Sequence, residues 1–134
     1  MKKDISNRED ILLLVTAFYK KLLADDSISY LFTHLAKIDL THHLPVLVDF
    51  WDSILFQSNT YQKNAMQPHM ALHQQSPLQK HHFDTWLNYF VQTVDELFEG
   101  EKAFLAKERA RSIATVMHIK TIQLNNEKRT VNTE

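Results

Sequence analysis

The sequence predicts an all-α fold, and two observations carry that prediction. Its 134 residues include one Gly and three Pro, too few for the many tight turns that a sheet protein needs. Apolar residues recur with the helical period of about 3.6 in four long segments, and the alternation of an exposed strand is sustained nowhere. We therefore expect one helical domain over residues 1–124 and a polar, disordered tail over residues 125–134.

Charge and composition narrow the function classes. Fifteen Lys and Arg against sixteen Asp and Glu give a formal charge of -1, so the chain lacks the basic field that binds nucleic acid. The absence of Cys excludes disulfides, thiolate zinc sites and a Cys nucleophile, so any metal must be held by His or carboxylate. The N-terminal residues do not form a secretory signal, and no uncharged run reaches about 18 residues. We expect a cytoplasmic protein without a nucleic acid or membrane partner.

The first predicted helix begins at a capping-box pattern, Ser6–Glu9. Its apolar stripe comprises Ile11, Leu14, Val15, Phe18, Leu22 and Leu23, and Tyr19 lies beside that stripe. A short stretch from Ile28 to Phe32 follows, long enough for one or two turns of helix.

The second long helix carries apolar residues from Leu40 to Leu55, with Pro45 near its beginning, where proline is tolerated best. His43 falls one turn before Leu47. From Gln57 to about Lys80 the pattern weakens, with a short helix around His69 to His73, and a ligand would have room there.

The third long helix is predicted from about Gln79 to Phe98, with Phe83, Trp86 and Phe90 on its apolar face. Glu99–Gly100 is expected to form its C-terminal cap, and His81 and His82 a solvated cap at its start. The fourth helix begins at about Lys102 and includes Met117 on its inner face.

A set of spaced residues resembles the third group of truncated haemoglobins, from about Ile11 to Ile122. The set consists of Phe18–Tyr19, then Leu31–Phe32 thirteen residues on, His43 seven residues before Phe50–Trp51, Tyr61 eight residues before His69, and the run His82–Leu87. The glycine pairs of the other truncated groups are missing, which suits the third group. One departure is Ala65–Pro68, where the family more often has Gly-Asn-Pro earlier in the loop.

The resemblance implies a two-over-two helical sandwich around haem b, in which the long helices correspond to B, E, G and H. His69 would be the proximal iron ligand, and Tyr19, His43 and Trp86 would face the bound gas on the distal side. The other residues expected around the haem are Phe32 at the ring edge, Leu47, Phe50, Trp51 and Met117 lining the pocket, and His73 either near a propionate or solvated.

The chemistry requires these residue types. A neutral imidazole can hold haem iron, and phenol, imidazole and indole donors stabilise polar bound dioxygen. Three donors would slow its release, which favours redox, nitric oxide or peroxide chemistry over oxygen transport. The expected small ligands are dioxygen, nitric oxide, carbon monoxide and peroxide. Peroxidase-like or nitric oxide dioxygenase-like turnover would need an external reductase, because ferric iron must be returned to ferrous.

Several alternatives remain open at the level of sequence. His69 and His73 are spaced to chelate zinc, but the residues between them do not form the His-Glu-x-x-His pattern. His42 could take the inward position of His43, and His43 could itself bind the iron. Tyr19 and Trp86 could be plain core residues, in which case the chain would be a non-haem helical adaptor with an aromatic core.

Overall fold

The computed structural model describes residues 2–32, 40–58 and 78–132, with side chains of the last helix described through Gln123. Regular structure in these ranges is entirely helical, which confirms the all-α prediction. The helices are α1 (Arg8–Ala24), α2 (Asp26–Tyr30), α3 (Leu40–Phe56), α5 (Lys80–Leu97) and α6 (Glu101–Asn132).

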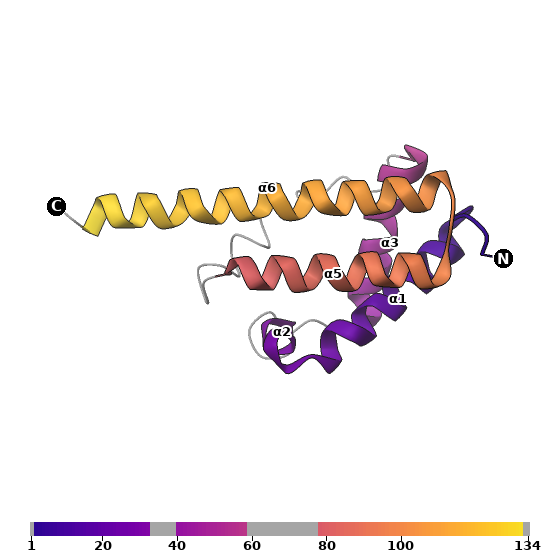
Figure 1. Cartoon of the computed structure of the whole chain (residues 1–134), viewed down its shortest axis with the longest axis horizontal. Helices are drawn as coiled ribbons and strands as arrows, with labels where there is room; N and C mark the ends of the chain where they lie inside the picture. Colours follow the sequence, from indigo (N-terminus) through magenta and orange to yellow (C-terminus); the bar gives the residue numbers. More distant parts are fainter. Residues whose placement is uncertain (1, 33–39, 59–77, 133–134) are drawn as a thin grey trace.

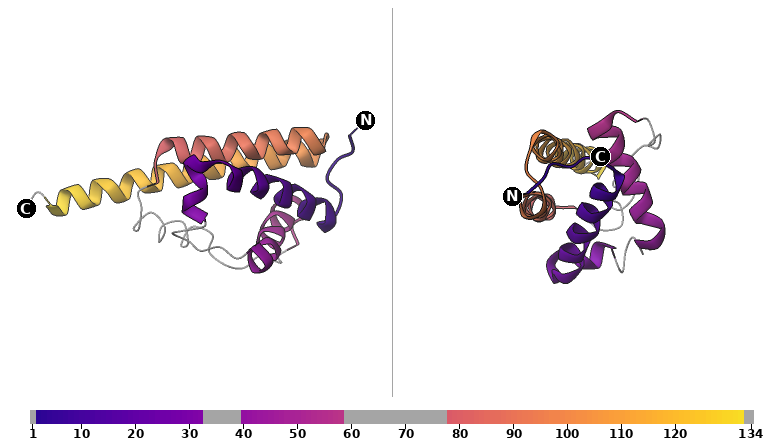
Figure 2. Two further views of the ribbon diagram at one scale, coloured as in Figure 1. Left: turned by 90° about the horizontal axis from the view of Figure 1, so that it is seen from below. Right: turned by 90° about the vertical axis from the view of Figure 1, so that its right-hand side faces the viewer.

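The long helices form two layers. α5 and α6 lie side by side and run in opposite directions, and α6 extends well past the other helices (Figure 1). Seen end-on, α1 and α3 lie across from that pair, and α1 contacts both α3 and α5 (Figure 2). The arrangement is the two-over-two sandwich that we expected.

The core explains why these segments pair. Ile11, Leu14, Phe18 and Leu22 recur along one face of α1 and are each at most 3% exposed. Across from them, α5 buries Phe90 and Val94. α6 contributes three small residues to the same core, Ala103, Ala106 and Ala110, which let its backbone approach α5 closely.

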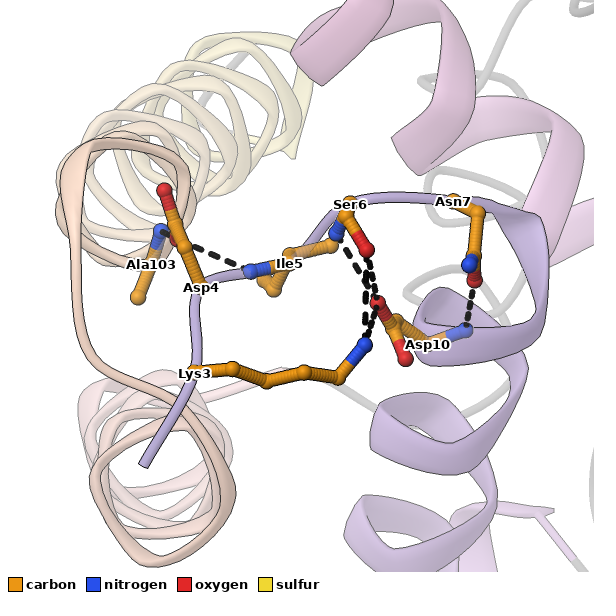
Figure 3. Close-up of polar contacts among 7 residues, drawn as sticks. All are labelled: Lys3, Asp4, Ile5, Ser6, Asn7, Asp10 and Ala103. Carbon is orange, nitrogen blue, oxygen red and sulfur yellow. Dashed lines mark hydrogen bonds and ion pairs between the residues drawn. The ribbon is translucent and has the colours of Figure 1, made fainter. Parts of the chain in front are cut away.

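The start of α1 corrects the predicted capping box by one residue. Asn7, not Ser6, is the N-cap, and its side chain accepts a hydrogen bond from the backbone N–H of Asp10 at 2.9 Å. The backbone N–H and the hydroxyl of Ser6 both donate to Asp10 Oδ2 at 2.9 Å, and Lys3 Nζ donates to the same oxygen at 2.8 Å (Figure 3). Asp10 therefore takes the place that we expected Glu9 to fill.

The prediction for Gly100 is also wrong. Phe98 is the C-cap of α5, and its N–H donates to the Val94 carbonyl at 2.8 Å. Gly100 instead precedes α6, with a φ of 144° that only glycine adopts easily, and its carbonyl accepts from the N–H of Phe104 at 2.9 Å.

Because Gly100 has no side chain, Asp4 caps α6 from the other end of the sequence. Its carboxylate accepts from the backbone N–H of Ala103 at 2.9 Å (Figure 3) and from that of Lys102, also at 2.9 Å. The backbone N–H of Glu99 donates to the Lys3 carbonyl at 2.9 Å. The segment 2–6, which we call the N-terminal arm, is thereby fixed to the turn between α5 and α6.

The starts of α5 and α6 agree closely with expectation, but the end of α6 does not. α5 begins one residue after Gln79, and Pro45 is the sixth residue of α3. The backbone of α6 remains helical to Asn132, through most of the segment that we expected to form a tail. Among the helices described, none has the length and apolar character that a membrane span requires.

Candidate functional site

Tyr19 and His43 come together from α1 and α3. The Tyr19 side chain is 5% exposed, and its hydroxyl lies 3.1 Å from His43 Nε2. The two rings are 5.5 Å apart and nearly perpendicular. Burial raises the pKa of Tyr19, so the phenol stays protonated and can donate a hydrogen bond throughout the physiological range.

An aromatic cluster joins this pair to Trp86 on α5. The Phe18 ring packs edge-on against both Tyr19, at 5.5 Å, and Trp86, at 5.7 Å. Trp86 is partly exposed and stacks on Phe90 at 5.8 Å. Three helices therefore bring the three sequence-predicted donors into one neighbourhood, with Phe18 in contact with two of them.

Phe32 borders the same neighbourhood. Its ring packs edge-on against Tyr19 at 5.6 Å, just past the end of α2. The side chain is only partly buried, so it presents apolar surface beside the phenol. Its predicted place at the edge of the haem ring stays a prediction.

The remaining predicted lining residues differ in how deeply they are buried. Leu47 and Phe50 on α3 are half-buried and pack against the core. Trp51 is 3% exposed and stacks on Phe90 at 4.7 Å, so its described contacts are those of a core residue. Met117 on α6 is 7% exposed yet lies outside the connected core cluster.

The proximal side lies outside the described residues. His69, His73 and Tyr61 all fall in the range 59–77, so their predicted roles stay predictions. Within the described ranges, no group of three or more His, Asp or Glu side chains could hold a metal ion.

His82 is buried, although its side chain was predicted to be solvated. It was expected to be solvated beside His81, but it is 4% exposed, whereas His81 is exposed as predicted. Its Nδ1 accepts from the backbone N–H of Gln79 at 3.0 Å, and its Nε2 lies 3.0 Å from the Tyr30 hydroxyl. Burial, and secondarily the nearby His81, lowers the pKa of His82. The signal that could have revealed it is the spacing of Gln79 and His82, which is that of a capping box.

The three side chains predicted to be distal have the chemistry that a haem binding small polar ligands would need. Tyr19, His43 and Trp86 supply a phenol, an imidazole and an indole, which are hydrogen-bond donors that carry no negative charge. Phe18 and Phe32 pack against the buried Tyr19 ring and limit access of water to it, which strengthens a hydrogen bond formed there. Such a set suits a ligand that gains partial negative charge.

Comparisons with known proteins agree with this geometry. The family model for bacterial-like globins matches residues 3–121. The chain is 24% identical over 118 residues to the group 3 truncated hemoglobin ctb of Campylobacter jejuni, covering 86% of this chain and 91% of that protein. It also superposes on the crystal structure of a group III truncated hemoglobin from Campylobacter jejuni with a TM-score of 0.78 and 23% identity, over 90% of this chain and 95% of the other.

The two-layer architecture, the clustered distal residues and the family match lead to one assignment. The chain belongs to the bacterial-like globin family and has the fold of a group III truncated haemoglobin.

Proposed function

We propose that this globin binds haem b through His69 and binds a diatomic ligand on the side of Tyr19, His43 and Trp86. Phe32, Leu47, Phe50, Trp51 and Met117 would contact the haem or the ligand, with His73 near a propionate or in solvent. The proposal favours redox, nitric oxide or peroxide chemistry over oxygen transport.

The observation that carries the proposal is the partly buried contact between the Tyr19 hydroxyl and His43 Nε2. If His43 carries its proton on Nε2, it donates to the Tyr19 oxygen, and the phenol hydrogen can then point to a ligand. If Nε2 is unprotonated, Tyr19 donates to His43 instead. The tautomer of His43 therefore decides whether the Tyr19 hydroxyl is available to donate to a ligand.

Trp86 supplies a donor from another direction. Among the described residues, its indole N–H has no hydrogen-bond partner, and the side chain is partly exposed. A polar ligand next to Tyr19 would thus find donors from two helices. Each such neutral hydrogen bond contributes about 0.5 to 1.5 kcal/mol, so the two together would retain a ligand tightly.

Tight retention is unsuited to carriage and suited to reaction. When bound, haem supplies the coordination position and the electron chemistry. The chain's own residues would hold the ligand, exclude water with the rings of Phe18 and Phe32, and hold a proton at the Tyr19 oxygen or at His43 Nε2. Repeated turnover with nitric oxide or peroxide would require an external reductase.

A haem titration tests the proposal. Haem added to the haem-free protein should give a Soret band that saturates at one haem per chain, and the reduced form should shift this band on addition of carbon monoxide. A protein that stays colourless, with unchanged stability in excess haem, would contradict the proposal and support a non-haem helical adaptor. The family match does not favour that alternative.

A further inference from the structure

A second pair, the buried His82 and the partly buried Tyr30, lies apart from the donors used above. His82 is in the first turn of α5 and Tyr30 is the last residue of α2, 52 residues earlier in the chain. Their side chains meet at 3.0 Å between His82 Nε2 and the Tyr30 hydroxyl, and the rings are 6.1 Å apart. This contact joins α2, which is followed by Phe32, to α5, which carries Trp86.

The hydrogen-bond geometry fixes the tautomer of His82. The backbone N–H of Gln79 donates to Nδ1 at 3.0 Å, so Nδ1 must be unprotonated. A neutral ring then carries its hydrogen on Nε2 and donates it to the Tyr30 oxygen. Protonation of Nδ1 would place its N–H opposite the backbone N–H of Gln79, and the hydrogen bond that caps α5 would break.

Both ends of the pair are continuous with the distal site. Tyr30 is followed by Leu31, which is 2% exposed, and then by Phe32, whose ring packs on Tyr19. On the other side, Trp86 follows His82 by one helical turn, on the same face of α5. A shift of α2 relative to α5 would therefore move Phe32 relative to Trp86.

We propose that His82 is a positioning residue for the distal pocket: in its neutral form it fastens the end of α2 to the start of α5 through Tyr30. The inference rests on the proposed function, since it assigns a consequence to ligand retention at that site. Neutral His82 keeps Phe32 and Trp86 in fixed positions around Tyr19. Protonated His82 loses its bond to Gln79, and the two side chains can then shift relative to Tyr19.

The direction of the pH effect follows from the surroundings of His82. In the described part of the chain, the titratable groups next to its ring are Tyr30 on α2 and His81 on α5, whose ring is 4.0 Å away. The pKa of His82 is lowered from its ordinary value of 6.5. The positioning should therefore be complete above pH 6.5 and be lost as the pH falls toward that lowered value.

Three variants separate the two bonds of His82. His82→Gln places an amide N–H near the position of Nε2, so it can keep the bond to Tyr30 without titrating. His82→Asn places its oxygen near Nδ1, so it keeps the cap and loses Tyr30. Tyr30→Phe removes one oxygen from a partly buried side chain and should leave the protein folded.

The first readout is the ¹⁵N spectrum of the imidazole in the diamagnetic carbon monoxide complex, which does not depend on activity. We expect an unprotonated Nδ1 and a protonated Nε2 at pH 7.5, with titration below pH 6.5. A protonated Nδ1 at pH 7.5, or titration at or above 6.5, would overturn the inference. If no haem complex forms, the proposed function fails instead, so the two failures are distinguishable.

The second readout is the oxygen dissociation rate between pH 5 and 8. At pH 7.5 the rate should rise about three- to tenfold in Tyr30→Phe and His82→Asn and stay near wild type in His82→Gln. Below pH 6.5 the wild-type rate should rise above that of His82→Gln, because only wild type can protonate this position. Equal rates for Tyr30→Phe and wild type, or equal pH profiles for wild type and His82→Gln, would overturn the inference.

Discussion

The Tyr19 hydroxyl is a polar group on a side chain that is only 5% exposed. Phe18 and Phe32 pack edge-on against its ring, and His43 contacts its oxygen at 3.1 Å. Because burial raises the pKa of Tyr19, its proton is retained and can be directed but not lost. The residue therefore combines a fixed position with a reliable donor.

Substitution of Tyr19 tests that role. Tyr19→Phe should accelerate oxygen dissociation from the haem-loaded protein by about three- to tenfold, the ratio expected for loss of one neutral hydrogen bond. Stopped-flow measurement gives the rate. Thr121→Val is the control, since it also removes one buried hydroxyl, which donates to the His118 carbonyl at 2.7 Å on α6 and lies outside the distal cluster. An unchanged rate in Tyr19→Phe would leave His43 and Trp86 as the ligand donors.

Two constraints favour glycine at position 100: the backbone conformation and the close approach of Asp4. Its φ is 144°, and a Cβ added there would lie 2.5 Å from Asp4 Cγ. Gly100→Ala should lower the free energy of unfolding by about 1 to 3 kcal/mol, through backbone strain and displacement of Asp4. Urea unfolding followed by circular dichroism measures the change.

A double-mutant cycle separates those two causes. With Asp4→Ala already present, the Cγ and carboxylate oxygens are gone, and Gly100→Ala should cost less than it does in wild type. Strict additivity of the two substitutions would show that the Asp4 carboxylate does not contribute, and would leave backbone strain and the close Asp4 Cβ, which alanine retains, as the causes.

At the scale of elements, the N-terminal arm is the connection that no local pattern reveals. Asp4 caps α6 across a separation of 98 residues, and Lys3 and Ser6 bind Asp10 near the start of α1. Ile5, between these contacts, is 2% exposed and belongs to the core. A short segment without regular structure thus ties the first helix to the last.

The cap supplied by Asp4 should make stability depend on pH. Burial alone would raise the pKa of Asp4, but hydrogen bonds from the N–H groups of Lys102, Ala103 and Ile5 outweigh it and lower the pKa. The ionised cap therefore contributes fully above the ordinary value of 3.8, and its contribution is lost as the pH falls below that value.

Two substitutions of Asp4 check this account. Asp4→Ala should lower the free energy of unfolding at pH 7 by about 0.5 to 2 kcal/mol, as loss of an N-cap does. Asp4→Asn keeps one acceptor oxygen and should show an intermediate loss with a weaker dependence on pH between 3 and 5. Wild-type pH dependence in Asp4→Asn would mean that another carboxylate, such as Asp10, accounts for it.

The sequence predicted those elements whose signals are local. Period and length placed the starts of the long helices to within a few residues, although α6 continues past its expected end to Asn132. The resemblance singled out Tyr19, His43 and Trp86 before their proximity was known. His82 and the caps at Asn7 and Asp4 were missed or misplaced. Each depends on a choice between neighbouring residues or on a partner far along the chain, as with Tyr30 and His82, which are 52 residues apart.

At the scale of the whole molecule, two layers of helices bring donors from α1, α3 and α5 to one place. No single helix contains this site, so the packing of α1 against both α3 and α5 determines its shape. The proposed function also requires a haem held from the segment that contains His69.

The most direct test is the optical spectrum of haem-loaded wild type, His69→Gly and the control His73→Gly, each oxidised and reduced. If His69 binds the iron, its loss should shift or remove the Soret band, added imidazole should restore it, and His73→Gly should resemble wild type. A His69→Gly spectrum identical to that of wild type would contradict the assignment of His69 as the iron ligand.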